Sequence, residues 1–470
     1  MSQPFPKTAF FAGNMGPIVM ECDAADLPVV GEIPPALQGT LYRNGPNPQF
    51  APRDQNHHWF IGDGMIHSFA IDRGKVAYRN RWVRTPKFQA ERAAGKALFG
   101  SWGNPMTTDP SVLGKDSGVA NTNIVSHAGR LLALEEGHRP FELDPATLEP
   151  KGYWDFTGKG SGRFTAHPKL DPETGEMVFF GYSVGGFFSP TMAYGVISAD
   201  GKVTRYETFE TPYPSMVHDF MVTRGHVLFP VLPLTGSMER ALSGKPAYAW
   251  EPAKGGHVGV LRRDARLAEM RWFKVDPCYV FHPMNAWEEG DKIVADVMQY
   301  EAAPLFPSPD GTPGDPDLAQ ARLCRWTFDL AGNSDQVKRD YIDDIPGEFP
   351  RFDERRAGLS YRHGYYAGRL NETPSGSFDT IVHFDHQTGK RLKYELPLGD
   401  AISEPVFVPR SADAPEGDGW LLAVAYRGGE KRSDLLVFEA GALDRGPIAT
   451  AQLSHRIPFG FHGNWRPADA

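Results

Sequence analysis

The chain has 470 residues, of which 41% are hydrophobic and 23% are charged, and its net charge is −9. This composition supports a packed globular core and excludes a largely disordered chain. The acidic balance and the lack of a long Lys/Arg run exclude a typical nucleic-acid-binding protein. The 50 glycines and 41 prolines follow no repeating period. Such a content is typical of many short elements joined by many turns.

The cysteines and the N-terminal residues bear on the compartment. Cys22, Cys278 and Cys324 are odd in number, far apart and without CxxC spacing, so we expect reduced thiols. Residues 1–30 lack a basic start followed by an apolar block, and we therefore expect no signal peptide. No apolar stretch reaches the roughly 18 residues of a membrane span. These features predict a cytoplasmic protein without a membrane span, and they leave shallow contact of a loop with a membrane open.

From residue 40 onward the sequence consists mostly of short β-like runs separated by turns that contain Asp and Gly. The first clear case is Ala70 to Ala77, in which Asp72-Arg73-Gly74-Lys75 separates two apolar runs. Asp and Gly supply the backbone conformations that tight β connections need. Similar hairpin signals follow at 143–145, 170–175, 198–202, 328–332 and 384–390.

This irregular repetition of small antiparallel sheets favours an all-β fold, a single β-propeller domain over 1–470 with elaborated loops. A pair of stacked β-sandwiches is the alternative that the pattern leaves open. Two segments look helical, 88–99 and 237–242. Both fit loops carried on one face of the sheet assembly, and no change of composition marks a domain boundary.

Four histidines far apart in the chain share one kind of setting. Each lies in a short apolar or aromatic run, next to a residue that ends or bends a strand. A single buried histidine of this kind is usually satisfied by a backbone carbonyl. Four of them together predict inward-pointing ligands of one metal ion. These residues are His167, His218, His282 and His462.

Three acidic residues stand beside apolar strands, where a surface loop acid is the usual interpretation. Glu136 follows the run Leu131 to Leu134, whereas Glu348 and Glu404 lie in short runs with proline. A metal-ligating histidine almost always donates its second ring N–H to a carboxylate or a carbonyl. The three carboxylates are therefore candidates to brace the histidines from behind.

Several short motifs follow one another along nearly the whole chain. They are Leu41 to Pro48, Gly62 to Met65, Asn121 to Asn123, Thr165 to Pro168, His218 to Phe220, Asn285 to Glu288, Ser403 to Pro405, Ala414 to Trp420 and His462 to Trp465. In this order they resemble the carotenoid cleavage oxygenase family. The resemblance implies a seven-bladed β-propeller with a cap of loops and helices over the metal face, and a non-haem Fe(II) on the propeller axis.

The same resemblance assigns roles to individual positions. It implies that the four histidines named above bind the iron, and that the three glutamates brace three of them. Thr122 matches a threonine whose methyl group crowds one coordination position in the family and limits what binds there.

Within the family, the chain is most similar to the bacterial lignostilbene dioxygenase and isoeugenol monooxygenase branch, which cleaves stilbenes and phenylpropenes. The stretches Glu91 to Pro105, Tyr361 to Tyr365 and Phe407 to Arg410 carry this closer match. Members that act on 4-hydroxystilbenes hold the phenol with a Phe, a Tyr and a Lys. Phe60 matches the Phe, but Trp102 and Glu135 stand at the Tyr and Lys positions.

Four neutral imidazoles suit Fe(II) and leave room for O₂ beside the substrate. The expected reaction breaks one conjugated C=C bond with O₂ and gives two carbonyl products. We expect Glu135 to accept a hydrogen bond from a phenolic hydroxyl, or to deprotonate it, although a solvated acid beside Glu136 is an equal alternative. Trp59, Phe60 and Trp102 are expected to form apolar walls around a small hydrophobic aromatic or polyene substrate.

Three other functions remain open at this point. An apocarotenoid-cleaving oxygenase would share the iron chemistry and differ in its substrate. A calcium-dependent hydrolytic propeller would need Asp, Asn and Glu ligands instead of four His. A propeller that only binds proteins would need no metal. The sequence also leaves open whether the chain acts alone or as a homo-oligomer.

Overall fold

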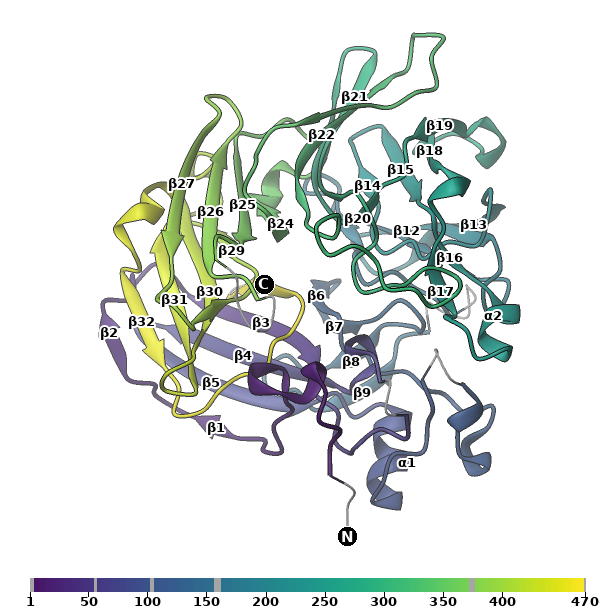
Figure 1. Ribbon diagram of the computed structural model, residues 1–470. Helices are drawn as coiled ribbons and strands as arrows, with labels where there is room; N and C mark the ends of the chain where they lie inside the picture. Colours follow the sequence, from purple (N-terminus) through teal and green to yellow (C-terminus); the bar gives the residue numbers. More distant parts are fainter. Residues whose placement is uncertain (1–3, 55–56, 102–104, 156–161, 372–376, 469–470) are drawn as a thin grey trace. The chain divides into compact units, whose positions relative to one another are not determined.

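The computed structural model describes residues 4–54, 57–101, 105–155, 162–371 and 377–468. The chain forms two compact units, which are coloured along the sequence in Figure 1. Unit 1 contains Met1–Trp154 and Tyr365–Ala470, and unit 2 contains Asp155–Gly364. Because unit 2 is inserted between two parts of unit 1, the chain leaves unit 1 and later returns to it. The single domain expected over 1–470 stays a prediction.

Unit 1 contains four antiparallel sheets, and the C-terminal strand joins the N-terminal sheet by pairing with β3 (Figure 1). In spatial order, the strands of the first sheet are β1 (Asp23–Ala24), β5 (Lys75–Trp82), β4 (Gly64–Asp72), β3 (Gly39–Pro46) and β33 (Gly463–Pro467). Those of the second are β2 (Val29–Gly31), β32 (Ala449–Gln452), β31 (Arg432–Glu439), β30 (Gly419–Arg427) and β28 (Ala401–Ile402), and β29 (Val406–Pro409) also pairs with β30. The third sheet contains β6 (Asn123–His127), β7 (Arg130–Leu134), β8 (Phe141–Leu143) and β9 (Pro150–Tyr153), and the fourth contains β25 (His363–Gly368), β26 (Thr380–Asp385) and β27 (Lys390–Glu395).

Unit 2 contains three four-stranded antiparallel sheets, a two-stranded ribbon and a last strand, β24 (Figure 1). The first sheet contains β10 (Lys169–Leu170), β11 (Met177–Gly181), β12 (Thr191–Ile197) and β13 (Val203–Glu210), and the second contains β14 (Met221–Val222), β15 (His226–Val231), β18 (Gly256–Arg262) and β19 (Arg271–Val275). The third sheet contains β20 (Tyr279–Glu289), β21 (Lys292–Tyr300), β22 (Arg322–Asp329) and β23 (Lys338–Tyr341). The ribbon consists of β16 (Leu234–Gly236) and β17 (Tyr248–Trp250), and β24 spans Gly347–Phe352.

The described strands thus fall into seven sheets of at least three strands, besides the β16–β17 ribbon. Seven is the number of blades that the family resemblance implies. The predicted all-β fold, a seven-bladed β-propeller with few helices, is confirmed.

The predicted hairpin at 70–77 shows why these segments become strands. Asp72 of β4 pairs with Lys75 of β5, so Arg73 and Gly74 form a two-residue turn. Both have positive φ, 46° and 79°, as a type I′ turn requires. The five later hairpin signals also lie between strands that pair with each other: β8 with β9, β10 with β11, β12 with β13, β22 with β23 and β26 with β27.

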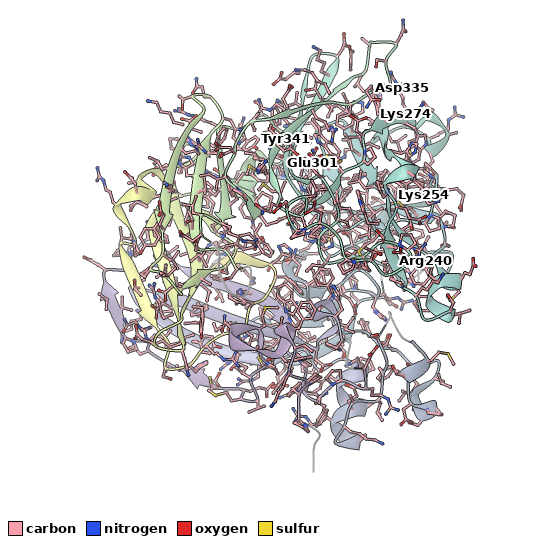
Figure 2. All side chains as sticks on the ribbon, viewed as in Figure 1. Arg240, Lys254, Lys274, Glu301, Asp335 and Tyr341 are labelled. Carbon is pink, nitrogen blue, oxygen red and sulfur yellow. The ribbon has the colours of Figure 1, made fainter. Side chains whose placement is uncertain are left out.

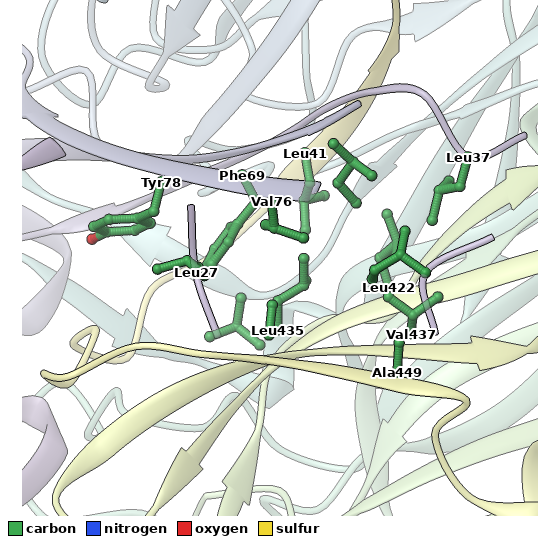
Figure 3. Close-up of a cluster of buried hydrophobic side chains, with 14 of the residues drawn as sticks. Leu27, Leu37, Leu41, Phe69, Val76, Tyr78, Leu422, Leu435, Val437 and Ala449 are labelled. Carbon is green, nitrogen blue, oxygen red and sulfur yellow. The ribbon is translucent and has the colours of Figure 1, made fainter. Parts of the chain in front are cut away.

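An apolar cluster of unit 1 lies between two of its sheets (Figure 3). Phe69 and Ile71 of β4 face it, as do Leu435 and Val437 of β31, and all four are at most 2% exposed. Their spacing of two residues is that of side chains on one face of a strand. Burying an apolar side chain of this size contributes about 1.5–3 kcal/mol, so this cluster fixes the register of both sheets.

Each of the two predicted helical segments overlaps one of the two α-helices among the described residues. The first, α1, spans Pro86–Ala94, so it begins two residues before the predicted segment and ends five residues before the predicted end. It begins after Thr85, whose Oγ1 accepts a hydrogen bond from the Phe88 N–H, and it ends at Gly95 with a φ of 66°. Beyond it, Glu91 accepts hydrogen bonds from the N–H groups of Leu98 and Phe99. The backbone after Gly95 therefore turns toward the Glu91 carboxylate instead of continuing the helix.

The second helix, α2, spans Met238–Leu242, and Ser237 caps its first turn by accepting the Arg240 N–H. The 3-10 helices among the described residues are η1 (Ala9–Phe11), η2 (Gly13–Met15), η3 (Trp59–Ile61), η4 (Pro105–Thr107), η5 (Pro110–Val112), η7 (Pro252–Lys254), η8 (Leu267–Glu269), η9 (Glu354–Arg356) and η10 (Ala440–Arg445). None of the helices in the described ranges has the length and hydrophobicity to cross a bilayer.

Polar side chains tie the loops of unit 2 to its sheets (Figure 2). The Tyr341 hydroxyl at the end of β23 donates to Glu301 and accepts a hydrogen bond of 2.8 Å from Gln299 of β21. The Arg240 guanidinium of α2 donates to the carbonyls of Thr235 and Pro246. These contacts hold α2 and the end of β21 in place.

Candidate metal centre

Three of the four predicted ligands come together inside unit 2. Nε2 of His218 lies 3.1 Å from Nε2 of His167 and 3.1 Å from Nε2 of His282. The side chains are buried, with 6–8% exposure. Ligand nitrogens of all three lie within 4.8 Å of one another. We call these three residues the histidine triad.

The backbone places the triad at the starts of strands or at an irregularity within one. His167 precedes β10 by two residues and His218 precedes β14 by three, so neither is fixed by a β-ladder. His282 lies inside β20, where the pairing with β21 shifts register between Val280 and Pro283. Such a bulge re-aims a side chain, which explains why a strand interior presents His282 to the triad.

Glu348 of β24 orients His282. Nδ1 of His282 donates to Oε2 of Glu348 over 2.6 Å, and the same oxygen accepts the Phe349 N–H over 2.7 Å. Phe349 has a φ of 56°, a left-handed conformation that non-glycine residues rarely adopt. Its ring stacks on His282 with 5.6 Å between centroids. The contact to Glu348 puts the proton on Nδ1, so Nε2 presents a lone pair to the triad.

The triad therefore fits a metal ion. Two nitrogens that bind one ion at about 2.1 Å, with an angle between a right angle and the tetrahedral value, lie about 3.0–3.4 Å apart. The observed separations of 3.1 Å fall in that range. The donor set is imidazole nitrogen, which suits iron and other transition metals. A calcium ion prefers six to eight oxygen ligands, and the triad offers none.

His462 of unit 1 has the same kind of support as His282. Its Nδ1 donates to Oε1 of Glu404 over 2.9 Å, while Oε2 of Glu404 accepts the Gly463 N–H over 2.8 Å. His462 and Glu404 are buried, with 5% and 6% exposure. Glu404 lies between β28 and β29, and His462 immediately precedes β33. The histidine and its carboxylate partner thus come from two segments of unit 1 that are 58 residues apart in the sequence and in contact in the structure.

Thr122 lies beside His462 within unit 1. The His462 N–H donates to the Thr122 carbonyl over 3.2 Å, and the Thr122 hydroxyl donates to Asn121 over 3.0 Å. The Asn121 amide in turn donates to the carbonyls of Phe60 and Gly62, both over 2.7 Å. This chain of contacts connects a predicted substrate wall to a predicted ligand. In the sequence, Asn121 stands out only as part of a motif, because its role depends on contacts that the sequence does not display.

The predicted aromatic wall is partly assembled in unit 1. Trp59 and Phe60 lie in η3, and their rings contact Phe461 with centroid distances of 4.5 and 5.5 Å. Phe461 directly precedes His462 in the sequence, a signal that could have identified it as part of the wall. Trp102 lies outside the described residues.

Glu135 is a structural anchor for the segment before Thr122. Its Oε1 accepts the N–H groups of Val119 and Ala120, over 2.7 and 3.3 Å, and lies 2.9 Å from Nδ1 of His138. Burial raises its pKa, but His138 and the two N–H donors outweigh burial, so that the pKa of Glu135 lies below its usual value. These contacts favour an anchoring role over that of a base, because a lowered pKa weakens a base.

Glu136 follows β7 and is half-buried in unit 1. Its predicted role as a brace for one of the histidines stays a prediction, as does the methyl group of Thr122 as a limit on ligand access.

The sequence does not single out one acidic residue that adjoins a predicted ligand. Asp219 follows His218, and its Oδ2 lies 3.8 Å from Nδ1 of His167.

Comparison with known proteins agrees with this geometry. A family profile described as retinal pigment epithelial membrane protein matches residues 15–467. Isoeugenol monooxygenase from Pseudomonas putida is 43% identical over 466 residues, which are 97% of each chain. A crystal structure of Pseudomonas brassicacearum lignostilbene dioxygenase is 37% identical with a TM-score of 0.96, covering 99% of this chain and 100% of the other. A crystal structure of a cobalt-substituted Synechocystis apocarotenoid oxygenase is 30% identical with a TM-score of 0.85, covering 96% of this chain and 97% of the other.

These relatives confirm the predicted family and the predicted enzyme class, an oxygenase. The match covers both units and nearly every residue that the structure describes. The chain belongs to the retinal pigment epithelial membrane protein family, which is the family of the carotenoid cleavage oxygenases.

Proposed function

We propose that the protein is an Fe(II)-dependent dioxygenase that cleaves a conjugated C=C bond of a stilbene or a phenylpropene. The expected products are two carbonyl compounds, one of them an aromatic aldehyde. The observation that carries the proposal is the buried triad with nitrogen separations of 3.1 Å, in which Glu348 fixes the tautomer of His282. Bound Fe(II) would supply the activation of O₂ that the breakage of an alkene requires.

His462 is proposed as the fourth ligand. It is buried like the triad, and a carboxylate occupies its Nδ1 in the way that Glu348 occupies Nδ1 of His282. Four neutral imidazoles leave coordination positions open on an ion that accepts six ligands. We propose Glu136 as a further brace and Thr122 as the residue that narrows access to one open position.

The residues of unit 1 are proposed to bind and orient the substrate. Trp59, Phe60 and Phe461 form an aromatic surface on which a flat conjugated ring can pack. Trp102 is proposed as a further part of it. Asn121 holds the Phe60 carbonyl, so the surface is fixed to the segment that carries Thr122.

A propenylphenol or a hydroxystilbene is favoured over an apocarotenoid as the substrate. The isoeugenol monooxygenase is 43% identical to this chain and the apocarotenoid oxygenase is 30% identical. An apocarotenoid-cleaving enzyme is the second candidate, because Glu135 does not reproduce the lysine that binds the phenol in other members. The location that we propose is the cytoplasm, and the three cysteines are free.

The test is incubation of the iron-loaded protein with isoeugenol, 4-hydroxystilbenes and apocarotenals under ¹⁸O₂, with the aldehydes identified by mass spectrometry. We expect labelled aromatic aldehydes from the first two classes, and we expect the activity to disappear on iron removal. Cleavage of apocarotenals alone would establish the second candidate. No iron-dependent cleavage of any of the three classes would refute both.

A separate experiment decides the role of Glu135. The variant Glu135→Gln is assayed on a 4-hydroxyphenyl alkene and on its methyl ether. If Glu135 anchors the 118–120 segment, as its contacts favour, the variant loses similar activity on both. A loss confined to the phenol would restore the role of hydrogen-bond acceptor or base.

A further inference from the structure

The carboxylate of Asp219 lies between a predicted metal ligand and a cation. Its Oδ2 is 3.8 Å from Nδ1 of His167 and 3.0 Å from Nζ of Lys169. Its Oδ1 is 2.7 Å from the same Nζ and accepts the Phe220 N–H over 2.7 Å. The Asp219 side chain is only 3% exposed. The carboxylate is therefore held from three sides.

The geometry of His167 makes this contact chemically relevant. Nε2 of His167 faces Nε2 of His218, so Nδ1 on the opposite edge of the ring faces Asp219. A carboxylate beside the second nitrogen of a ligating histidine raises the basicity of the ring and strengthens its bond to the metal. At 3.8 Å the two atoms attract each other but lie beyond hydrogen-bond distance. His282 and its carboxylate, in contrast, are 2.6 Å apart.

Lys169 is the closer partner of this carboxylate. Its ammonium contacts both oxygens of Asp219, and it lines a pocket of unit 2 that Arg224 also lines. The Lys169 side chain is 29% exposed. Hence the lysine competes with His167 for the Asp219 carboxylate, and it neutralises part of the negative charge that the imidazole senses.

We propose that Asp219 is a positioning residue for His167 and that Lys169 sets how strongly it acts, so that the Asp219–Lys169 pair tunes the metal affinity of the triad. The proposal rests on the proposed iron site and goes beyond the three glutamates. It assigns the two residues opposite effects. Asp219 strengthens His167 as a ligand, whereas Lys169 weakens it.

The test is the affinity for Fe(II) and for Co(II), measured anaerobically by competition with a chromophoric chelator in the parent and in two variants. For Asp219→Asn we expect weaker binding by up to about tenfold, the lower end of the effect of losing a hydrogen-bonded partner, because the contact of 3.8 Å to His167 is electrostatic only. For Lys169→Met we expect tighter binding, by about threefold or more, because the freed carboxylate can approach Nδ1. The visible absorption of bound Co(II) provides a readout that is independent of turnover.

Two control variants isolate the charge of Lys169. Lys169→Arg keeps a cation beside Asp219 and should bind metal like the parent. Arg224→Gln removes another cation of the same pocket, one that pairs with Glu173, and should also leave the affinity unchanged. Lys169→Met leaves a buried carboxylate without its cation. If that variant does not fold, Asp219→Asn and the two controls still decide whether Asp219 affects metal affinity.

The outcomes separate the inference from the proposed function. A purely structural ion pair predicts that both variants bind metal more weakly, and that result overturns the inference. Unchanged affinity in both variants overturns it as well. If the parent binds neither ion, the proposed iron site itself fails. If the parent binds iron and the two variants shift in opposite directions, the inference is confirmed.

Discussion

Nδ1 of His282 and Oε2 of Glu348 are 2.6 Å apart, and both residues are buried. This hydrogen bond fixes which nitrogen of the ring faces the triad. The same carboxylate oxygen accepts the Phe349 N–H of its own strand, β24, so the backbone fixes the acidic side chain that orients the ligand.

Removal of this carboxylate should weaken iron binding without unfolding the protein. For Glu348→Gln we expect about 10- to 100-fold lower iron affinity, because the amide keeps the shape of the side chain and loses its charge. Iron content after dialysis and the rate of alkene cleavage measure the effect. Glu354→Gln is the matched control, since Glu354 is 57% exposed and pairs with Arg351. Equal iron content in both variants would contradict the proposed role of Glu348.

Lys87, a largely buried cation of unit 1, should contribute strongly to stability. Lys87 contacts Asp63 and Glu91, each over 2.8 Å, and both carboxylates have 3% exposure. Since Lys87→Met leaves two buried charges without their cation, we expect a loss of about 3–5 kcal/mol in the free energy of unfolding. Urea denaturation measures it.

The control for that prediction is Lys75→Met on β5. Lys75 pairs with Asp26 over 3.1 Å, but its side chain is 73% exposed. We expect a loss below about 1 kcal/mol for an exposed pair. Similar losses in the free energy of unfolding for Lys87→Met and Lys75→Met would show that the burial of the Lys87 ion pairs adds nothing to stability.

Glu135 should make stability depend on pH in a defined direction. The pKa of its carboxyl is lowered from the ordinary value of 4.5. A lowered pKa in the folded state stabilises the fold above the unfolded-state pKa, and this contribution is lost as pH falls through the folded-state pKa. The stability difference between the parent and Glu135→Gln should therefore be constant from pH 7 to about pH 5 and shrink below pH 4.5. A difference that grows on acidification would exclude an anchoring carboxylate.

Asn121 should affect the substrate more than the metal. Asn121→Ala removes hydrogen bonds to the carbonyls of Phe60 and Gly62 and the acceptor of the Thr122 hydroxyl. At about 0.5–1.5 kcal/mol for each bond, we expect KM to rise by about tenfold while the iron content stays near that of the parent. Steady-state kinetics and iron analysis measure both. Asn333→Ala, at an exposed position, is the control. Loss of iron in Asn121→Ala would place the residue in the metal site instead.

The sequence predicts the elements whose cause is local. Asp72 to Lys75 forms the expected turn because Gly74 tolerates positive φ, and both helices begin after a hydroxyl cap. The setting of the histidines is also local, and His167, His218 and His282 do come together. The expected helix runs too far, however. The carboxylate of Glu91 captures the segment that follows Gly95, which no periodicity reveals.

What the sequence does not predict depends on long-range contacts. Asp219 stands next to a predicted ligand in the sequence, but its own contacts are to His167 and Lys169. Glu135 matched a substrate-binding position of the family, yet its contacts are backbone N–H groups and His138. In both cases the partner is set by strand packing, and the residue type alone leaves several partners open.

Four imidazoles are proposed to hold one iron ion. Anomalous diffraction at the iron edge, from crystals of the Fe(II)-loaded protein, tests this arrangement. We expect a single peak at about 2.1 Å from Nε2 of His167, His218, His282 and His462. A peak held by the triad alone, or by oxygen ligands elsewhere, would refute the four-histidine site.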